Sequence, residues 1–558
     1  MRLRSVQMTG LPFLPKILLL PVILLTSFWV LQHFAETNIF KDGIKFILVL
    51  PITTSPPTCS QNLSEMADIL LPSVLLPSDN PASTQFSAWL VAFNSHDYDT
   101  LLAYHDAYFP LNDAISDVGI IDREIGFSNH TGGFDIINVL DSSPGNPAAS
   151  INVLLREKNR PQYARAVMEV DANKESHPVT KFDINPTHTP IEFVPHDRKD
   201  EFERALAPLT PTRRRAIVKE ISDVVREQYI FPEVGEKMIT DLEAKVQENG
   251  DYNCYEESEA FAQRLTDDMH AISGDGHVRI MFSEPPPHRN DVGDHSDDDE
   301  QGRGRPENLF DELRHINFGF GVPSTESIQD KRLGYLPINA FVPSTPDIAF
   351  DSAAIRKEIG GIISSIADTD ALIIDLRNNG GGQPDTVAFV VSYFVDGDAP
   401  IHLNDMVDRQ GAVKYSYSTL PASSLPEGTA RFGGLKPLFV LTSKGTVSGG
   451  EEMAYDLQAL KRAHAIIGDG AETTAGAAHP VMNAKSICTD EFGKNWWVAA
   501  VPDMRPVNAV TGTNWERVGV KSDVVVEKGD DAKALARRMA MEALGLNDIG
   551  VSARGQVR

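Results

Sequence analysis

The feature that most limits the possible folds is a regular alternation between Ile316 and Leu544 of apolar strand-like runs with helix-like segments. Alternation of this kind is typical of an α/β layer in which helices cover a largely parallel sheet. We therefore predict an α/β domain over residues 313–545. The expected strands are Gly334–Ile338, Ala371–Leu376, Pro437–Thr442, Ala465–Ile467 and Trp496–Val501, and the expected helices are Asp351–Ala367, Asp385–Val395, Gly450–Arg462 and Ala532–Ala543.

Three further regions precede this domain, as expected for a chain of 558 residues, which is too long for one hydrophobic core. Residues 83–195 begin with an amphipathic helical stretch and end in alternating β-type runs, which predicts an α+β accessory domain. Its first helix, around Trp89, resembles that of the cone-shaped folds related to ketosteroid isomerase and nuclear transport factor. Residues 200–282 show three amphipathic helical stripes, which predict a helical cap. Residues 283–312 are rich in proline and acidic residues, which predicts a solvated insertion.

The N-terminus carries a targeting signal. Two arginines, Arg2 and Arg4, precede an apolar run, Leu11–Leu31, which Lys16 interrupts. We expect an uncleaved signal-anchor over residues 1–35 with the arginines cytoplasmic. A Pro/Ser-rich stalk over residues 36–82 would then hold the rest of the chain at a membrane, on the lumenal or extracellular side. A cleaved signal peptide and a secreted product remain the alternative.

The composition and motifs of the chain argue against some classes of partner and cofactor. A formal net charge of -27 argues against nucleic acid, because phosphate binding needs clustered Lys and Arg. The three cysteines form no CxxC pair, and no nucleotide or zinc-peptidase motif occurs, so we expect no metal and no cofactor. Two N-x-S/T sequons, at Asn62 and Asn129, are compatible with a glycoprotein. The oligomeric state is open.

Two strand ends carry the candidate chemistry. Residues 371–382 form a buried-type strand that leads directly into three glycines, whose backbone can approach a ligand closely. Residues 438–453 form a strand and a turn, in which Ser448 stands just before a new helix. A serine there is more often only a helix N-cap. The N–H of Gly449 and the glycine loop nevertheless offer the two donors that an oxyanion hole needs.

These segments resemble the tail-specific or C-terminal-processing serine peptidases, in particular the branch of the tricorn core and the interphotoreceptor-retinoid-binding protein. The resemblance covers about residues 205–545 and implies a crotonase-like α/β core with a helical cap. It rests on Gly276-His277, Asp375-x-Arg377-x-Asn379-x-Gly381-Gly382, Thr446-Val-Ser448-Gly-Gly-Glu451 and the tail Gly512–Asp523.

The resemblance also implies roles for single residues. Ser448 would be the nucleophile and His277 its general base, and Glu516 would support the histidine directly or through another hydroxyl. The oxyanion hole would combine Gly449 with Gly381 or Gly382. Three further residues would brace the glycine loop rather than do chemistry, namely Asp375, Arg377 and Asn379.

The general base is the point at which the sequence departs from many family members. Those members carry a lysine in a Gly-Lys step, which reads Gly476-Ala477 here, and no lysine occurs between Lys461 and Lys485. We therefore expect a histidine base, with activity rising around pH 6–7 as for an ordinary imidazole. His479 either lines the cleft or has no role.

Together these features predict a serine-type peptidase acting on a peptide or protein substrate. One alternative is a binding protein for hydrophobic, retinoid-like molecules with vestigial activity. The other is a hydrolase of non-peptide esters or amides in a biosynthetic pathway. Fold alone does not separate these functions.

Overall fold

The computed structural model describes residues 74–109, 118–145, 147–285, 310, 313–314, 316–344, 352–468, 470–473, 476–488, 495–526 and 531–546. The expected signal-anchor, most of the stalk and most of the acidic insertion lie outside these residues. Within the described ranges, no helix has the length and apolarity that a membrane span requires.

A six-stranded sheet forms the centre of the C-terminal domain, in the order β16-β12-β11-β8-β7-β6. Neighbouring strands are parallel except β6 and β7, which form an antiparallel hairpin at one edge. The predicted largely parallel sheet is therefore confirmed. The strands are β6 (Ser324–Ile328), β7 (Lys331–Pro337), β8 (Ala371–Asp375), β11 (Leu438–Thr442), β12 (Ala465–Gly468) and β16 (Val524–Val525).

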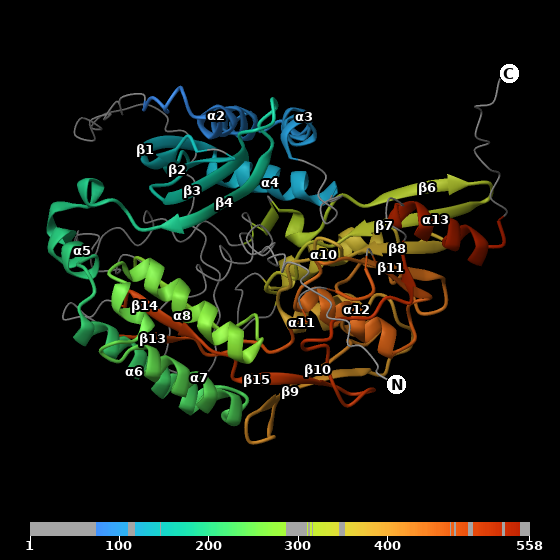
Figure 1. Ribbon diagram of the computed structural model, residues 1–558. Coiled ribbons are helices and arrows are strands. Elements are labelled where there is room, and N and C mark those ends of the chain that lie inside the picture. Colours follow the sequence, from blue (N-terminus) through green and yellow to red (C-terminus); the bar gives the residue numbers. More distant parts are fainter. Residues whose placement is uncertain are drawn as a thin grey trace, which may run out of the picture.

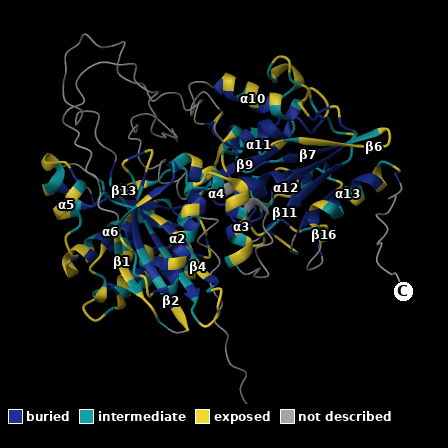
Figure 2. Cartoon of the chain, turned by 90° about the horizontal axis from the view of Figure 1, so that it is seen from above, coloured by how far each residue is buried: buried dark blue, intermediate teal, exposed yellow. Residues whose placement is uncertain are grey.

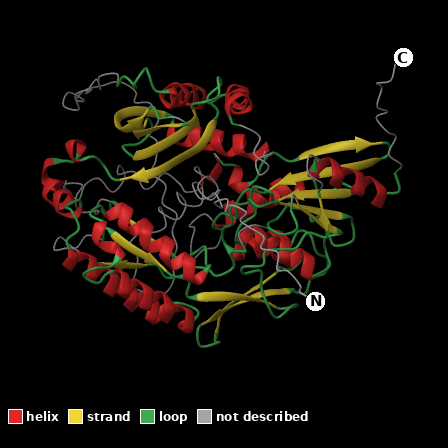
Figure 3. Cartoon of the chain, viewed as in Figure 1, coloured by secondary structure: helices red, strands yellow, loops and turns green. Residues whose placement is uncertain are grey.

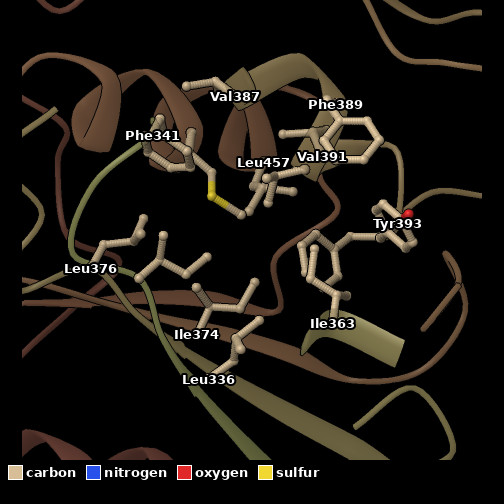
Figure 4. Close-up of a cluster of buried hydrophobic side chains, with 14 of the residues drawn as sticks. Leu336, Phe341, Ile363, Ile374, Leu376, Val387, Phe389, Val391, Tyr393 and Leu457 are labelled. Atoms are coloured by element: carbon tan, nitrogen blue, oxygen red, sulfur yellow. The ribbon is translucent and has the colours of Figure 1, made fainter. Parts of the chain in front are cut away.

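Helices cover both faces of this sheet. Successive residues of a strand point to opposite sides, so neighbouring residues pack against different helices. Leu372 and Ile374 of β8 pack under α10 (Ser352–Ser364), α11 (Pro384–Val391) and α12 (Gly449–Ala459), in the cluster shown in Figure 4. Ala371 and Ile373 pack against α13 (Ala532–Ala543) on the other face. Figure 2 shows the centre of the sheet as buried and the β6 edge as more exposed. Every residue of β8 and β11 is buried, which explains their continuous apolar sequences.

The cap contains strands as well as the three predicted helices, α6 (Pro211–Gln228), α7 (Pro232–Lys245) and α8 (Ser258–Ser273). These helices pack on a three-stranded antiparallel sheet in the order β13-β14-β5, visible beside them in Figure 3. The strands are β5 (Arg279–Phe282), β13 (Lys485–Ile487) and β14 (Trp497–Ala500). The expected strand Trp496–Val501 is therefore real, but its placement in the parallel sheet was wrong. It pairs with β5, which begins two residues after His277.

A third sheet was not anticipated from the sequence. It joins β9 (His402–Asp408), β10 (Val413–Ser418) and β15 (Met504–Asn508) in antiparallel order β10-β9-β15. Figure 1 shows it below the central sheet, on the side of α11 and α12.

The N-terminal unit is an α+β structure with its own core. Its helices α2 (Pro81–Asn94), α3 (Tyr98–Tyr108) and α4 (Val118–Thr131) lie against a four-stranded antiparallel meander (Figure 1). The strands are β1 (Phe134–Ser143), β2 (Ala148–Glu157), β3 (Tyr163–Asp171) and β4 (Val179–Thr187). Helix α5 (Lys199–Ala205) leads on to the cap. Short 3₁₀ turns occur at Ile191–Phe193, His196–Arg198, Asp251–Cys254, Asn317–Gly319 and Ala422–Ser424.

Candidate active site

Ser448 occupies a strained turn between β11 and α12. It has φ 51° and ψ -113°, a backbone conformation that costs a residue with a side chain about 1–3 kcal/mol. Its N–H donates to Glu451 Oε2 at 3.0 Å, and its side chain is half-buried. Serine hydrolases of other folds also expose a nucleophile on a sharp strand-to-helix turn. The strain therefore indicates a function beyond that of an N-cap.

The glycine loop follows β8, the parallel neighbour of β11, so that both loops leave the same edge of the sheet. Asn379 is fully buried and joins them. Its side-chain amide donates to Ile338 O at 2.9 Å, and its backbone carbonyl accepts the N–H of Val447, also at 2.9 Å. A Cβ on Gly381 would lie only 2.9 Å from the Cβ of Ser448, so this approach requires glycine.

The backbone donors of the two loops are not equivalent. The N–H of Gly381 donates to Asn379 Oδ1 at 2.9 Å and is therefore occupied. Within the described part of the chain, the N–H groups of Gly382 and Gly449 have no hydrogen-bond acceptor. They lie close together, because a Cβ on Gly449 would be 3.1 Å from Gly382 N. The geometry thus favours Gly382 over Gly381 as the residue whose N–H, together with that of Gly449, could bind an oxyanion.

Asp375 and Arg377 hold the base of the glycine loop. Arg377 Nε and Nη2 both donate to the Asp375 carboxylate, the latter at 2.7 Å. Tyr335 donates its hydroxyl to Asp375 Oδ2 at 2.6 Å, and the backbone carbonyl of Arg377 accepts the hydroxyl of Ser443 at 2.6 Å. These contacts fix the backbone at the start of the glycine loop.

Glu451 connects the Ser448 turn to the segment in which the expected Gly-Lys step reads Gly476-Ala477. Its carboxylate, fully buried, accepts the N–H groups of Ser448, Gly476 and Ala477 and the hydroxyl of Thr473. Burial raises the pKa of Glu451 to about 7, although these hydrogen bonds act to lower it. Lys485, the nearest later lysine, is exposed on β13 in the cap.

His277 follows a turn at the end of α8. Gly274 ends the helix with φ 63°, and the N–H of His277 donates to Asp275 Oδ1 at 3.1 Å. The His277 side chain is 20% exposed. Burial lowers the pKa of His277 to about 4, below the range expected for an ordinary imidazole. Among the described residues, no hydrogen bond joins His277 to Ser448.

Glu516 lies against His479 rather than His277. Its Oε2 accepts the N–H of Ala478 at 2.7 Å and that of His479 at 3.2 Å, and it lies 3.4 Å from His479 Nδ1. The same Nδ1 is 3.3 Å from Asp275 Oδ2. Ligand-type atoms of Asp275, His479 and Glu516 lie within 4.8 Å of one another, a spacing that could also hold a metal ion.

One chain of contacts joins these groups. The Ser448 turn is bonded through Glu451 to Gly476 and Ala477, and the chain continues to His479, which contacts both Asp275 and Glu516. In the described part of the chain, these contacts therefore link the Ser448, Glu516 and His277 segments indirectly. Such a site can supply a hydroxyl nucleophile, two backbone donors and a neutral imidazole.

Sequence reasoning assigned no role to Glu451 or Asp275. Glu451 stands three residues after Ser448, which is the spacing of a capping box. Asp275 stands two residues before His277, where a carboxylate can reach the histidine N–H. Both signals were present in the sequence.

The class defined by this fold and site is an α/β protein with a strained serine on a strand-to-helix turn. Two family models match the chain: peptidase family S41 over residues 332–526, and the N-terminal domain of peptidase family S41 in eukaryotic IRBP over residues 205–311. Together they match more than half of the chain. The chain belongs to peptidase family S41.

Individual relatives are distant. A carboxy-terminal processing protease of Bacillus subtilis is 28% identical over 148 residues, which are 26% of this chain and 26% of that protein. The chain thus matches about a quarter of the length of this curated relative. A putative peptidase of Parabacteroides merdae is 14% identical with a TM-score of 0.38, covering 61% of this chain and 99% of that one. The tricorn protease is 12% identical with a TM-score of 0.34, covering 73% and 42%. Family membership rests on the sequence matches.

Proposed function

We propose that this chain is a serine peptidase with Ser448 as its nucleophile. The observation that carries the proposal is the strained conformation of Ser448 beside the N–H groups of Gly382 and Gly449, which have no acceptor among the described residues. A carrier of hydrophobic molecules needs neither a strained serine nor paired donors. Family membership favours a peptide substrate over a non-peptide ester or amide.

Catalysis would proceed by acyl transfer. His277 Nε2 takes the proton of the Ser448 hydroxyl as its oxygen attacks the peptide carbonyl carbon. The N–H groups of Gly382 and Gly449 stabilise the negative oxygen of the tetrahedral intermediate. The C–N bond then breaks, and His277 returns the proton to the departing amine. A water molecule, activated by the same imidazole, releases the acyl group from Ser448.

We extend the proposal to the domains of the chain and to the residues around Ser448. The continuous connection of the Ser448, Glu516 and His277 segments supports a crotonase-like catalytic domain over 313–545, with the cap over 200–282 supplying the base. The three helices and four-stranded meander support a cone-like accessory domain over 83–195. Asp375, Arg377 and Asn379 would act as the scaffold of the oxyanion hole, and Glu516 would support the base.

The substrate class is tested with a defined mixture of unmodified peptides, incubated with the wild-type chain and with Ser448→Ala. Mass spectrometry reads the new termini. We expect cleaved peptide bonds with wild type alone. Hydrolysis of aryl esters without cleavage of any peptide would instead support a non-peptide hydrolase.

We expect the acid limb of kcat/KM near pH 4 instead of pH 6–7. A protonated imidazole cannot accept the Ser448 proton, so activity is lost as the pH falls through the pKa of His277, which burial lowers to about 4. The titratable groups that act on this pKa are Asp275, which raises it, and Arg279, His479 and His270, which lower it. A pH profile on a fluorogenic peptide measures this limb. A midpoint at pH 6.5 or above would show that a solvated group is the base.

We also propose that residues 1–35 anchor the chain in a membrane with the catalytic domain lumenal or extracellular. The arginines before the apolar run support this orientation, and Lys16 stands near one end, where it can reach the interface. Carbonate extraction should leave the protein in the membrane pellet, and a glycosidase should shift its mobility. Soluble protein that lacks its first ~35 residues would show a cleaved signal peptide instead.

A further inference from the structure

Three buried groups form a carboxylate–imidazole–carboxylate chain behind the proposed base. Asp275 is 1% exposed and His479 is 3% exposed. His479 Nδ1 lies 3.3 Å from Asp275 Oδ2 and 3.4 Å from Glu516 Oε2. When both acids are ionised they can only accept hydrogen bonds, so the His479 tautomer that fits them carries a hydrogen on Nδ1 and offers it to both.

Asp275 faces two histidines at once. Its Oδ2 accepts the Tyr229 hydroxyl at 3.3 Å as well as contacting His479, and its Oδ1 accepts the N–H of His277. Oδ1 also lies 4.0 Å from His277 Nδ1, a buried atom that has no hydrogen-bond partner within the described residues. A histidine that receives a proton at Nε2 needs an acceptor at Nδ1–H. Catalytic hydrogen bonds are often long in the free enzyme and shorten in the substrate complex.

Glu516 has no such relation to His277. Within the described residues its carboxylate accepts hydrogen bonds from the backbone N–H groups of Ala478 and His479 and lies 3.4 Å from His479 Nδ1, so its hydrogen-bonded path to His277 passes through His479 and Asp275. The pKa values of the two acids are also shifted in opposite directions. Burial acts to raise the pKa of Asp275, but the hydrogen bond from His479 and the nearby His277 hold it below its usual value. Burial raises the pKa of Glu516.

We propose that Asp275 is the carboxylate that orients His277 and stabilises its protonated form, and that His479 is a positioning residue that links Asp275 to Glu516. This inference rests on the proposed function, because it requires His277 to act as the base for Ser448. It assigns to Asp275 the role that the resemblance gives to Glu516, and it gives His479 a function.

The probe is a fluorophosphonate, and the measured quantity is its second-order rate of reaction with Ser448 as a function of pH. We expect Asp275→Asn to lower this rate by about 10³–10⁴-fold, as when a triad acid is replaced by its amide. The acid limb should also move to lower pH, because the negative charge that raises the pKa of His277 is gone. Glu516→Gln should cost about tenfold, the scale of one weakened hydrogen bond. Asp267→Asn, the same change at an exposed position of α8, is the matched control and should react at the wild-type rate.

A second pair of variants keeps the test valid if Asp275→Asn does not fold. His479→Asn retains a donor near the position of Nδ1, whereas His479→Ala leaves two carboxylates facing each other without one. We expect the asparagine variant to react at least tenfold faster than the alanine variant, again the scale of a hydrogen bond. Equal rates for this pair would overturn the inference, and so would a wild-type rate and acid limb for folded Asp275→Asn. In either case, labelling that still depends on Ser448 would uphold the proposed function. Labelling of Ser448→Ala at the wild-type rate would instead refute the proposed function itself.

Discussion

Replacing Ser448 by alanine is expected to lower kcat for peptide hydrolysis by about 10⁶-fold, the cost of removing a serine nucleophile. The fold should be nearly unaffected, because the change deletes one oxygen from a half-buried side chain and keeps the Cβ. Single-turnover assays measure the activity, and thermal unfolding measures Tm. We expect a Tm within a few degrees of wild type.

Two companion variants make this result specific. Ser365→Ala removes an exposed serine at the end of α10 and should retain full activity. Ser448→Gly should be as inactive as Ser448→Ala but equally or more stable, by up to about 1 kcal/mol, because glycine adopts φ 51° without a Cβ penalty. Residual turnover of Ser448→Ala above about 1% of wild type would not be compatible with the assigned nucleophile.

Replacing His277 by alanine is expected to reduce kcat by about 10⁵–10⁶-fold, nearly as much as Ser448→Ala, because nucleophile and base act as one unit. The double variant Ser448→Ala/His277→Ala should lose almost nothing more. His402→Ala, at an exposed histidine of β9, is the control and should keep wild-type kcat. Near-wild-type activity of His277→Ala would indicate that a lysine, and not His277, is the general base. Lys485, exposed in the cap, would then be the residue to replace.

The centre of the six-stranded sheet could be predicted because its middle strands are buried on both faces and therefore read as apolar runs. Residues Ala371–Asp375 and Leu438–Thr442 are the clearest examples. Pairing between distant segments was not visible. Trp496–Val501 has the composition of a central strand, yet β14 pairs with β5, more than 200 residues earlier in the chain. Periodicity shows that a strand exists, but only tertiary packing selects its partner.

The candidate site also contains residues that the sequence reveals and relations that only the fold reveals. Ser448 and the glycine loop were accessible because each motif is contiguous, and adjacent parallel strands bring them to one edge of the sheet. The occupied N–H of Gly381 was not accessible, since it depends on the folded position of the Asn379 side chain. The contact of Glu516 with His479 joins residues 37 positions apart, and no spacing rule marks such a pair. The low pKa of His277 likewise comes from burial, which appears only in the fold.

The most direct test of the central claim is identification of the residue that a fluorophosphonate modifies. Wild-type protein is labelled to completion at neutral pH, digested, and sequenced by tandem mass spectrometry, with Ser448→Ala treated in parallel. We predict one adduct per chain, located on Ser448, and no labelling of the alanine variant. An adduct on any other residue, or equal labelling of the two proteins, would contradict the assignment of Ser448 as the nucleophile.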